Sequence, residues 1–209
     1  MVNTYEASIF INCPFDKDYD PFLKCIVYTV YRCGFVPRSA MEEDDSSDSR
    51  LDKIVRLIKS CKFGIHDISR TQPDASTYLP RFNMPFKLGV FWGMKKNGNK
   101  LQKSKIALIF EYEKYSYQKY LSDINGVDVK AHYNSAEIII KHIRNWLYTN
   151  TGKKEIPSIN RIIKDYTDFS TQILPEMLTA SHSILDELTF NDFCEFVNLS
   201  LKAKMNAIK

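Results

Sequence analysis

Polar side chains that could contact a ligand follow two short apolar runs of the sequence. Asn12 comes directly after the run at 7–11, while Asp67 lies near the end of the run at 63–68 and Ser69 follows it. Arg81 and Asn83 lie a little further along the chain. A carboxylate can act as an acid or a base, and a guanidinium binds anions through paired hydrogen bonds. These residue types point to a small polar ligand, provided that the fold brings them together.

Each of these residues also has a structural interpretation. Asp67 could cap the loop that follows its strand, and Asn12 is of a type common in turns. Arg81 could pair with an acidic neighbour instead of an anionic ligand. His66 precedes Asp67 and therefore faces the opposite side of an alternating strand, where we expect it to pack in the core. The sequence leaves both interpretations open for Asp67, Asn12 and Arg81.

A metal site is not expected. None of the four histidines has a partner at the spacing of zinc ligands: His66, His132, His142 and His182. The acidic run at 42–45 lacks the convergent partners of a Mg²⁺ cage, which favours a solvated or helix-capping role. Asp123 and Asp128, with His132, flank Gly126; they either form a turn or reach a site from a fifth strand.

The composition is that of an ordinary soluble globular protein. The chain has 209 residues, 44% of them hydrophobic and 26% charged, and a net charge of +4. Its two signs of charge are interspersed, so we expect no nucleic-acid partner. No apolar run is long enough to span a bilayer and the first residues do not resemble a signal peptide, so we expect a cytoplasmic protein with no membrane partner.

Two other residue types need an interpretation. The densest basic stretch is either a solvated surface loop or an anion-contacting patch, and it comprises Lys95, Lys96, Lys100, Lys103 and Lys105. Of the five cysteines, Cys25, Cys33 and Cys61 fall on the apolar stripes of expected helices, and no pair has C-x-x-C spacing. We therefore expect reduced thiols in the core.

Strands and helices alternate along the first 152 residues. Apolar runs predict five strands, at 7–11, 35–36, 63–68, 106–110 and 127–129. Apolar residues at helical spacing predict four helices in this part of the chain. The first is capped by Asp20, begins with Pro21 and ends at Gly34, and the second covers 51–61. The third has Pro85 in its first position, and the fourth covers 136–147 and ends at Gly152. The Tyr-rich segment 112–120 predicts a short helix or turn, and the long loop over 69–84 is typical of a functional segment.

This alternation predicts an α/β fold of the flavodoxin-like, doubly wound type, with a parallel five-stranded sheet in the order 2-1-3-4-5. We expect residues 1–152 to form this domain and residues 153–209 to form a C-terminal helical appendage. The appendage would pack on the sheet domain or on a second subunit, and its last helix would start near Thr189, where Thr189 and Asp192 resemble a capping box.

Ligands of such sheets bind beyond the carboxyl ends of the strands, where the strand order reverses. In this order that point lies between the first and third strands, so the segments 12–20 and 67–83 should line the crevice. Neither contains the G-x-G-x-x-G or G-x-x-x-x-G-K-[ST] pattern, which argues against a conventional dinucleotide site and a P-loop kinase.

Three short segments resemble motifs of one protein family. They are FINCPF at 10–15, GIHDIS at 64–69 and MPFKLG at 84–89. They look like motifs of the nucleoside 2-deoxyribosyltransferase-like group, which is related to TIR domains, and the resemblance covers residues 5–150. Members of that group bind nucleosides or nucleotides, including NAD, and break the N-glycosidic bond. Bacterial members often serve in anti-phage defence.

The resemblance implies a site made of these segments and their neighbours. NAD or another nucleotide is the expected substrate or ligand, with no metal. Catalytic positions would be Lys87 and Asp67, and the expected substrate-binding residues are Phe10, Asn12, Phe15, Arg38, Ser69, Arg81, Asn83 and Met84.

Lys87 stands where the family has its catalytic glutamate, which would face the ribosyl C1′ as that carbon becomes cationic. An ammonium about 4 Å from this cation costs roughly 4 kcal/mol at an effective dielectric near 20, and the lost carboxylate forfeits a similar stabilisation. The usual glycosidase route is therefore impaired. Three roles stay open for Lys87: a phosphate contact beside Arg81 in the first turn of its helix, an exposed surface lysine, or a substitution in a scaffold that is otherwise active.

Three functions are consistent with these patterns. The first is a TIR-like nucleotide-binding sensor or regulator of bacterial defence or signalling, whose helical tail contacts a partner protein or a second copy. The second is an active NAD or nucleoside glycohydrolase in which Asp67 or Glu42 replaces the missing glutamate. The third is a TIR-type interaction module with an empty crevice.

Overall fold

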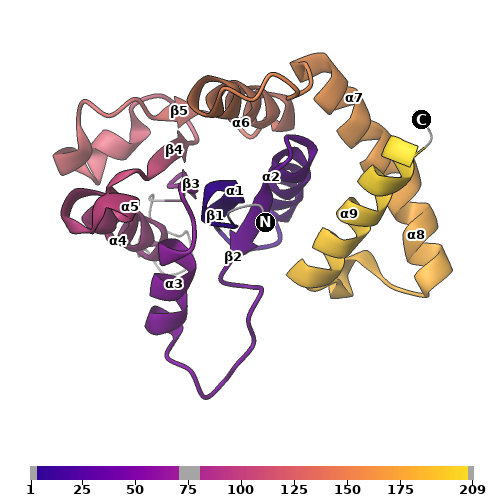
Figure 1. Cartoon of the computed structure of the whole chain (residues 1–209), viewed down its shortest axis with the longest axis horizontal. Coiled ribbons are helices and arrows are strands. Elements are labelled where there is room, and N and C mark those ends of the chain that lie inside the picture. The colour runs from indigo at the N-terminus through magenta and orange to yellow at the C-terminus, as the bar shows by residue number, and fades with distance from the viewer. Residues whose placement is uncertain (1–3, 71–80, 207–209) are drawn as a thin grey trace.

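The computed structural model describes residues 4–70 and 81–206. Its centre is a parallel sheet of five strands in the order β2-β1-β3-β4-β5 (Figure 1). The strands are β1 (Ser8–Asn12), β2 (Val36–Ser39), β3 (Phe63–Asp67), β4 (Ile106–Glu111) and β5 (Lys130–Ala131). The parallel sheet and its strand order confirm the prediction.

Helices cover both faces of this sheet, as in a doubly wound fold (Figure 1). On one face lie α2 (Asp20–Arg32) and α6 (Ala136–Thr151); on the other lie α3 (Arg50–Lys59) and α4 (Asn83–Asn97), with the short α5 (Lys100–Lys103) beside α4. Because side chains alternate along a strand, Ile9 and Ile11 pack beneath α2 and α6, whereas Phe10 packs against α3 and α4.

Short elements complete this part of the chain. α1 (Thr4–Ala7) precedes β1, and the Tyr-rich segment forms the 3₁₀ helix η1 (Ser116–Lys119), followed by η2 (Ser122–Ile124). The predicted position of the fifth strand is wrong by a few residues: β5 forms at Lys130–Ala131 and not at 127–129. Val127 and Val129 instead pack partly buried in a small cluster with Tyr117 and Ile109.

The C-terminal helices share the core of the α/β part. α7 (Ile159–Asp168) continues through a π-helical turn, η3 (Phe169–Ile173), into α8 (Leu174–Ser181); η4 (Leu185–Glu187) and α9 (Phe190–Asn206) follow. Ile162, Phe169 and Val197 are fully buried in the same apolar cluster as Tyr28 of α2. These helices therefore pack on the outer side of α2 (Figure 1), while a contact with a second subunit stays a prediction.

A buried carboxylate reinforces this packing. Asp165 of α7 is 1% exposed and pairs with Arg32 of α2 at 2.8 Å, with Arg161 at 3.0 Å and with Lys204 of α9. Burial acts to raise the pKa of Asp165, but hydrogen bonds from Lys204 and Arg32 outweigh it and hold this pKa below its usual range. One charge thus joins three helices.

The helix boundaries follow the expected signals with two corrections. Gly34 and Gly152 adopt positive φ just after α2 and α6, and Thr189 and Asp192 form the expected reciprocal cap of α9. Asp20 is the first residue of α2 and not its cap; its carboxylate pairs with Lys24 at 2.5 Å. α4 begins at Asn83, so Pro85 is its third residue and not its first.

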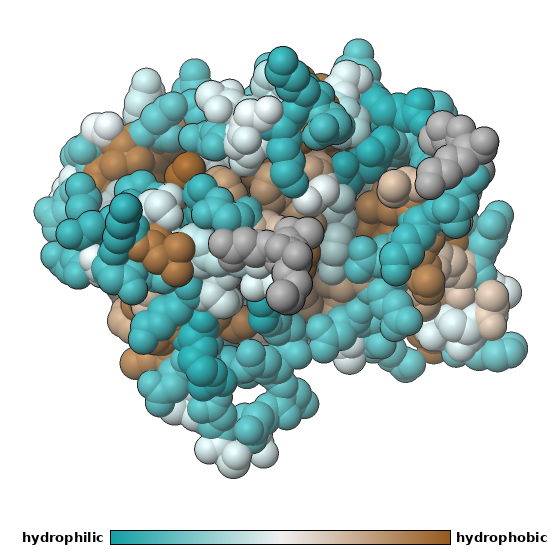
Figure 2. All heavy atoms as spheres, viewed as in Figure 1, coloured by the Kyte–Doolittle hydropathy of each residue, from teal (hydrophilic) through white to brown (hydrophobic). Residues whose placement is uncertain are grey.

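The cysteines are core thiols, but the basic stretch is not a single surface loop. All five cysteines are free and buried, as predicted for Cys25, Cys33 and Cys61. Lys105 is fully buried and donates hydrogen bonds to the carbonyls of Ile58 and Cys61 at the end of α3. Hydrophilic residues nevertheless cover most of the face in Figure 2, with hydrophobic patches between them. No helix in the described part of the chain is long and apolar enough to cross a membrane.

Candidate functional site

The expected crevice lies beyond the carboxyl ends of β1 and β3. The two strands pair in parallel, with Asn12 opposite His66, so Asp67 comes one residue further along. The start of α4 lies beside them, because its Met84 contacts Asn12. The topology therefore brings the three family-like segments to one edge of the sheet.

Asn12 and His66 form a buried polar pair on the α4 side of this edge. Both are fully buried; Nδ2 of Asn12 donates a 2.8 Å hydrogen bond to the carbonyl of Met84 and lies 3.1 Å from Nδ1 of His66. Burial lowers the pKa of His66 to about 3, and nearby Lys105 and Lys87 act in the same direction. A neutral imidazole can accept this hydrogen bond, so His66 packs in the core as predicted.

Asp67 lies on the other face, in a buried polar cluster with Tyr19 and His132. The hydroxyl of Tyr19 donates a 2.5 Å hydrogen bond to Oδ2, and the backbone N–H of Ser69 donates to Oδ1 at 2.8 Å. Nε2 of His132 lies 3.1 Å from Oδ2, although this contact is poorly aligned for a hydrogen bond. His132 accepts at Nδ1 from the backbone N–H of Asn134, which leaves its proton on Nε2, toward Asp67.

Asn12 and Asp67 reach the same edge of the sheet but do not face one common surface. Side chains one residue out of register on adjacent strands point to opposite faces of a sheet. Asn12 accordingly faces α4, whereas Asp67 faces Tyr19 and His132, and neither is exposed. Whether either residue contacts a ligand stays a prediction.

Lys87 is the charged group that stands out at this edge. It is the fifth residue of α4 and only 5% exposed, which rules out the surface-lysine interpretation. Its Nζ lies 5.0 Å from the centroid of the Phe15 ring, and no acidic side chain in residues 4–70 or 81–206 pairs with it. Burial lowers its pKa; Cys13 opposes that shift and Arg50 adds to it. Because Lys87 lies one turn inside α4, it is not in the first turn as expected.

The other expected binding residues are dispersed. Arg81 is exposed and pairs with Asp16 at 2.5 Å, with Arg70 3.6 Å from the same carboxylate. Arg38 forms a two-oxygen ion pair with Glu42 at the other side of β1. Of the remaining ones, Asn83 is exposed, Ser69 is half-buried, and Phe10 and Met84 are buried in apolar clusters.

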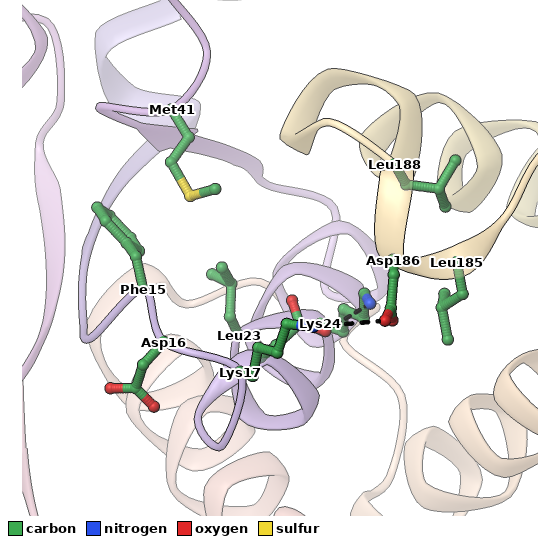
Figure 3. A pocket seen from close by; sticks show the side chains of 10 residues that line it. Phe15, Asp16, Lys17, Leu23, Lys24, Met41, Leu185, Asp186 and Leu188 are labelled. Atoms are coloured by element: carbon green, nitrogen blue, oxygen red, sulfur yellow. Dashed lines mark hydrogen bonds and ion pairs between the residues drawn. The ribbon is translucent and has the colours of Figure 1, made fainter.

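A cavity of about 250 Å³ opens beside Phe15 (Figure 3). Phe15, Leu23 and Met41 line it from the α/β part, while Leu185 and Leu188 line it from the C-terminal helices. Its charged lining is mixed: Asp16, Lys17, Asp20, Lys24 and Asp186. The cavity thus lies between the crevice and the appendage, with the Phe15 ring shared between it and Lys87.

Sequence reasoning missed the role of Tyr19 and left that of His132 open. Tyr19 precedes α2 in place of a capping residue, and a buried tyrosine there gave no separate signal. His132 directly follows β5, so the 2-1-3-4-5 order alone would have placed it at the carboxyl edge. In the described part of the chain no group of three acidic, histidine or cysteine side chains could hold a metal ion.

Compared with models of known protein families, the chain matches none. A comparison with curated proteins likewise gives no match.

Proposed function

We propose that this chain is a TIR-like nucleotide-binding protein of bacterial defence or signalling that does not cleave the N-glycosidic bond. The observation that carries the proposal is the buried ammonium of Lys87 beside Phe15, with which no acidic side chain of residues 4–70 or 81–206 pairs. NAD, or another nucleotide with the same phosphates, is the ligand class that this pair suits.

A buried charge is costly unless a counter-charge compensates it. Lys87 has an aromatic ring as its neighbour but no carboxylate among the described residues. A ligand phosphate would supply the missing negative charge, and lysine binds phosphate as a compact cation. Binding would therefore raise the lowered pKa of Lys87 and stabilise the folded chain.

The aromatic and apolar lining beside Phe15 suits the uncharged part of such a ligand. Phe15 is 38% exposed, so part of its ring is free to contact a base or ribose. Leu23 and Met41 extend this surface into the cavity. The cavity alone is smaller than a typical ligand pocket, so it would hold one part of the nucleotide only.

The two carboxylates that could replace the family glutamate are already engaged. Asp67 is fully buried and bound by Tyr19 and the Ser69 amide, and Glu42 accepts hydrogen bonds from Nε and Nη2 of Arg38. Freeing either of them would cost hydrogen bonds made to a charged group. This favours a binding protein over an active glycohydrolase.

Thermal unfolding with added NAD, ADP-ribose and nucleosides tests the proposal. Ligand at 100 times its dissociation constant should add about 2.7 kcal/mol of stability. The ligand-induced shift should disappear in Lys87→Met and persist in Lys96→Met, an exposed lysine of the same helix. Comparing shifts, and not absolute midpoints, allows for the effect of Lys87→Met on the unliganded protein.

Release of free base, followed by chromatography, separates the alternatives. Base release by the wild-type protein at an ordinary enzymatic rate, abolished by Asp67→Asn, would establish the glycohydrolase. No thermal shift at millimolar ligand would instead favour the interaction module. Lys87→Glu should create base release if the family assignment is correct, because it restores the carboxylate.

A further inference from the structure

A second cavity, of about 500 Å³, lies at the carboxyl ends of β4 and β5. Its volume is within the roughly 300–1,000 Å³ of small-molecule sites. The wall combines the loop after β4, the segment leading into β5 and the start of α6. None of the expected nucleotide-site residues lines it, and neither does any residue of the cavity beside Phe15.

Three lysines line this cavity: Lys114, Lys130 and Lys141. Lys130 pairs with Asp128 at 2.5 Å, but that carboxylate is 82% exposed and well solvated. Lys114 and Lys141 have no acidic partner in the described part of the chain. The cavity therefore carries two lysines that make no ion pair with the described residues.

The one buried acid in the wall is already committed. Glu111 is 2% exposed and accepts hydrogen bonds from the backbone N–H of Tyr115 at 3.0 Å, the hydroxyl of Ser116 at 3.1 Å and the N–H of Tyr117 at 3.2 Å. These donors are uncharged, so they fix the loop after β4 without neutralising the carboxylate. The wall therefore has three lysines against two carboxylates, Glu111 and Asp128, which leaves an excess of positive charge.

Two tyrosine residues line the same cavity as these lysines. Tyr115 is 66% exposed and Tyr133 is 47% exposed, and both side chains line the cavity. Both residues have positive φ, at 67° and 50°, a backbone conformation that costs free energy in residues other than glycine. Aromatic rings exposed at a cavity provide stacking faces for a planar group.

His142 of α6 reports the same concentration of positive charge. Its ring packs against Phe110 at 6.1 Å between centroids, and its side chain lines the cavity. Burial lowers the pKa of His142, and the nearby Lys130, Lys141 and His132 lower it further. Asp128 alone acts to raise it. A neutral imidazole here can donate or accept a hydrogen bond to a ligand.

We propose that this cavity binds a small anion carried on a planar ring, such as a nucleoside monophosphate. Lys114 and Lys141 contact the phosphate, Tyr115 and Tyr133 contact the ring, and His142 completes the polar lining. This site is independent of Lys87, so the two proposals stand or fall separately.

Titration of the full chain with AMP, adenosine and inorganic phosphate tests the site, with affinity measured by calorimetry and the His142 ring protons followed by NMR. AMP should bind and shift the His142 signals, while adenosine and phosphate, each with half of the recognised groups, should bind at least about tenfold more weakly.

Variants assign the binding to this cavity. Lys114→Met with Lys141→Met should weaken AMP binding by about a hundredfold, and Tyr133→Asn, which tolerates the left-handed backbone, by about tenfold. Lys119→Met, an exposed lysine outside the cavity, should leave it unchanged. Equal loss in Lys119→Met, binding without a shift at His142, or no AMP binding at millimolar concentration would overturn the proposal.

Discussion

The hydroxyl of Tyr19 donates a 2.5 Å hydrogen bond to Oδ2 of Asp67 across the gap between the loop after β1 and the end of β3. Both side chains are buried, so the bond lies out of water. Burial, together with the charge of nearby Asp67, raises the pKa of Tyr19 well above its usual range, and the phenol therefore stays a donor at all ordinary pH values. Asp67 thus has a clear structural role whatever else it does.

Tyr19→Phe should destabilise the fold by about 1–3 kcal/mol, because it removes the hydroxyl that donates a hydrogen bond to the buried Oδ2 of Asp67. The free energy of unfolding in denaturant measures this loss. Tyr120→Phe removes a hydroxyl from a 41% exposed ring and is the matched control, which should change stability by less than about 0.5 kcal/mol. Equal effects in the two variants would contradict the role given to Tyr19.

His66 should make the protein acid-sensitive. Its pKa is about 3 in the folded chain, compared with about 6.5 when unfolded, so the unfolded state binds the extra proton as the pH falls from 6.5 to 3. Stability from this group is complete above pH 6.5 and is lost progressively below it, by a few kcal/mol at pH 3. Unfolding free energies measured across this window should show a smaller slope in His66→Phe. The exposed His182, replaced by asparagine, should leave the slope unaltered.

Lys105→Met should be among the more destabilising lysine substitutions, by about 2–3 kcal/mol. The buried ammonium donates to the carbonyls of Ile58 and Cys61 at the end of α3, where methionine offers no donor.

Burial lowers the pKa of Lys105 to about 8, so the unfolded chain holds more protons between pH 8 and about 10.5. Stability in this window should therefore rise with pH in the wild type and less so in the variant. Lys103→Met, at an exposed neighbouring position, is expected to match the wild type in denaturant unfolding.

Asp165→Asn should loosen the C-terminal helices from α2. The change leaves Arg32, Arg161 and Lys204 without their common carboxylate, and breaking such a buried cluster costs about 3–5 kcal/mol. Limited proteolysis should cut the variant faster near residues 152–158, between α6 and α7. Asp168→Asn, which removes a more exposed carboxylate paired with Lys164 alone, should be cut at the wild-type rate. Unchanged proteolysis in Asp165→Asn would show that apolar packing alone holds these helices.

The same carboxylate predicts a second pH effect. The pKa of Asp165 is lowered on folding, so its stabilisation is present above the unfolded pKa of about 3.9 and is lost as the pH falls through the folded pKa. Proteolysis near 152–158 should therefore accelerate more steeply in strong acid in the wild type than in Asp165→Asn. This distinguishes it from His66, whose effect begins near pH 6.5.

The strand order and most helices could be predicted from the sequence, because local patterns determine them. Apolar runs at 7–11 and 63–68, helical spacing between them, and Gly34 and Gly152 after α2 and α6 each act within a few residues of chain. Right-handed crossovers and short connections then leave few orders for five parallel strands. The capping box at Thr189 is equally local, and it formed as predicted.

The tertiary structure alone decided what each polar side chain does. Strand alternation and register send Asn12 to α4 and Asp67 to Tyr19, although both follow apolar runs at the same edge. Likewise, residues far apart in sequence bury Lys105 and Lys87, whereas the sequence left an exposed position open for both. Burial and partners depend on contacts between distant segments, and those contacts decide whether a charge is solvated, paired or left for a ligand.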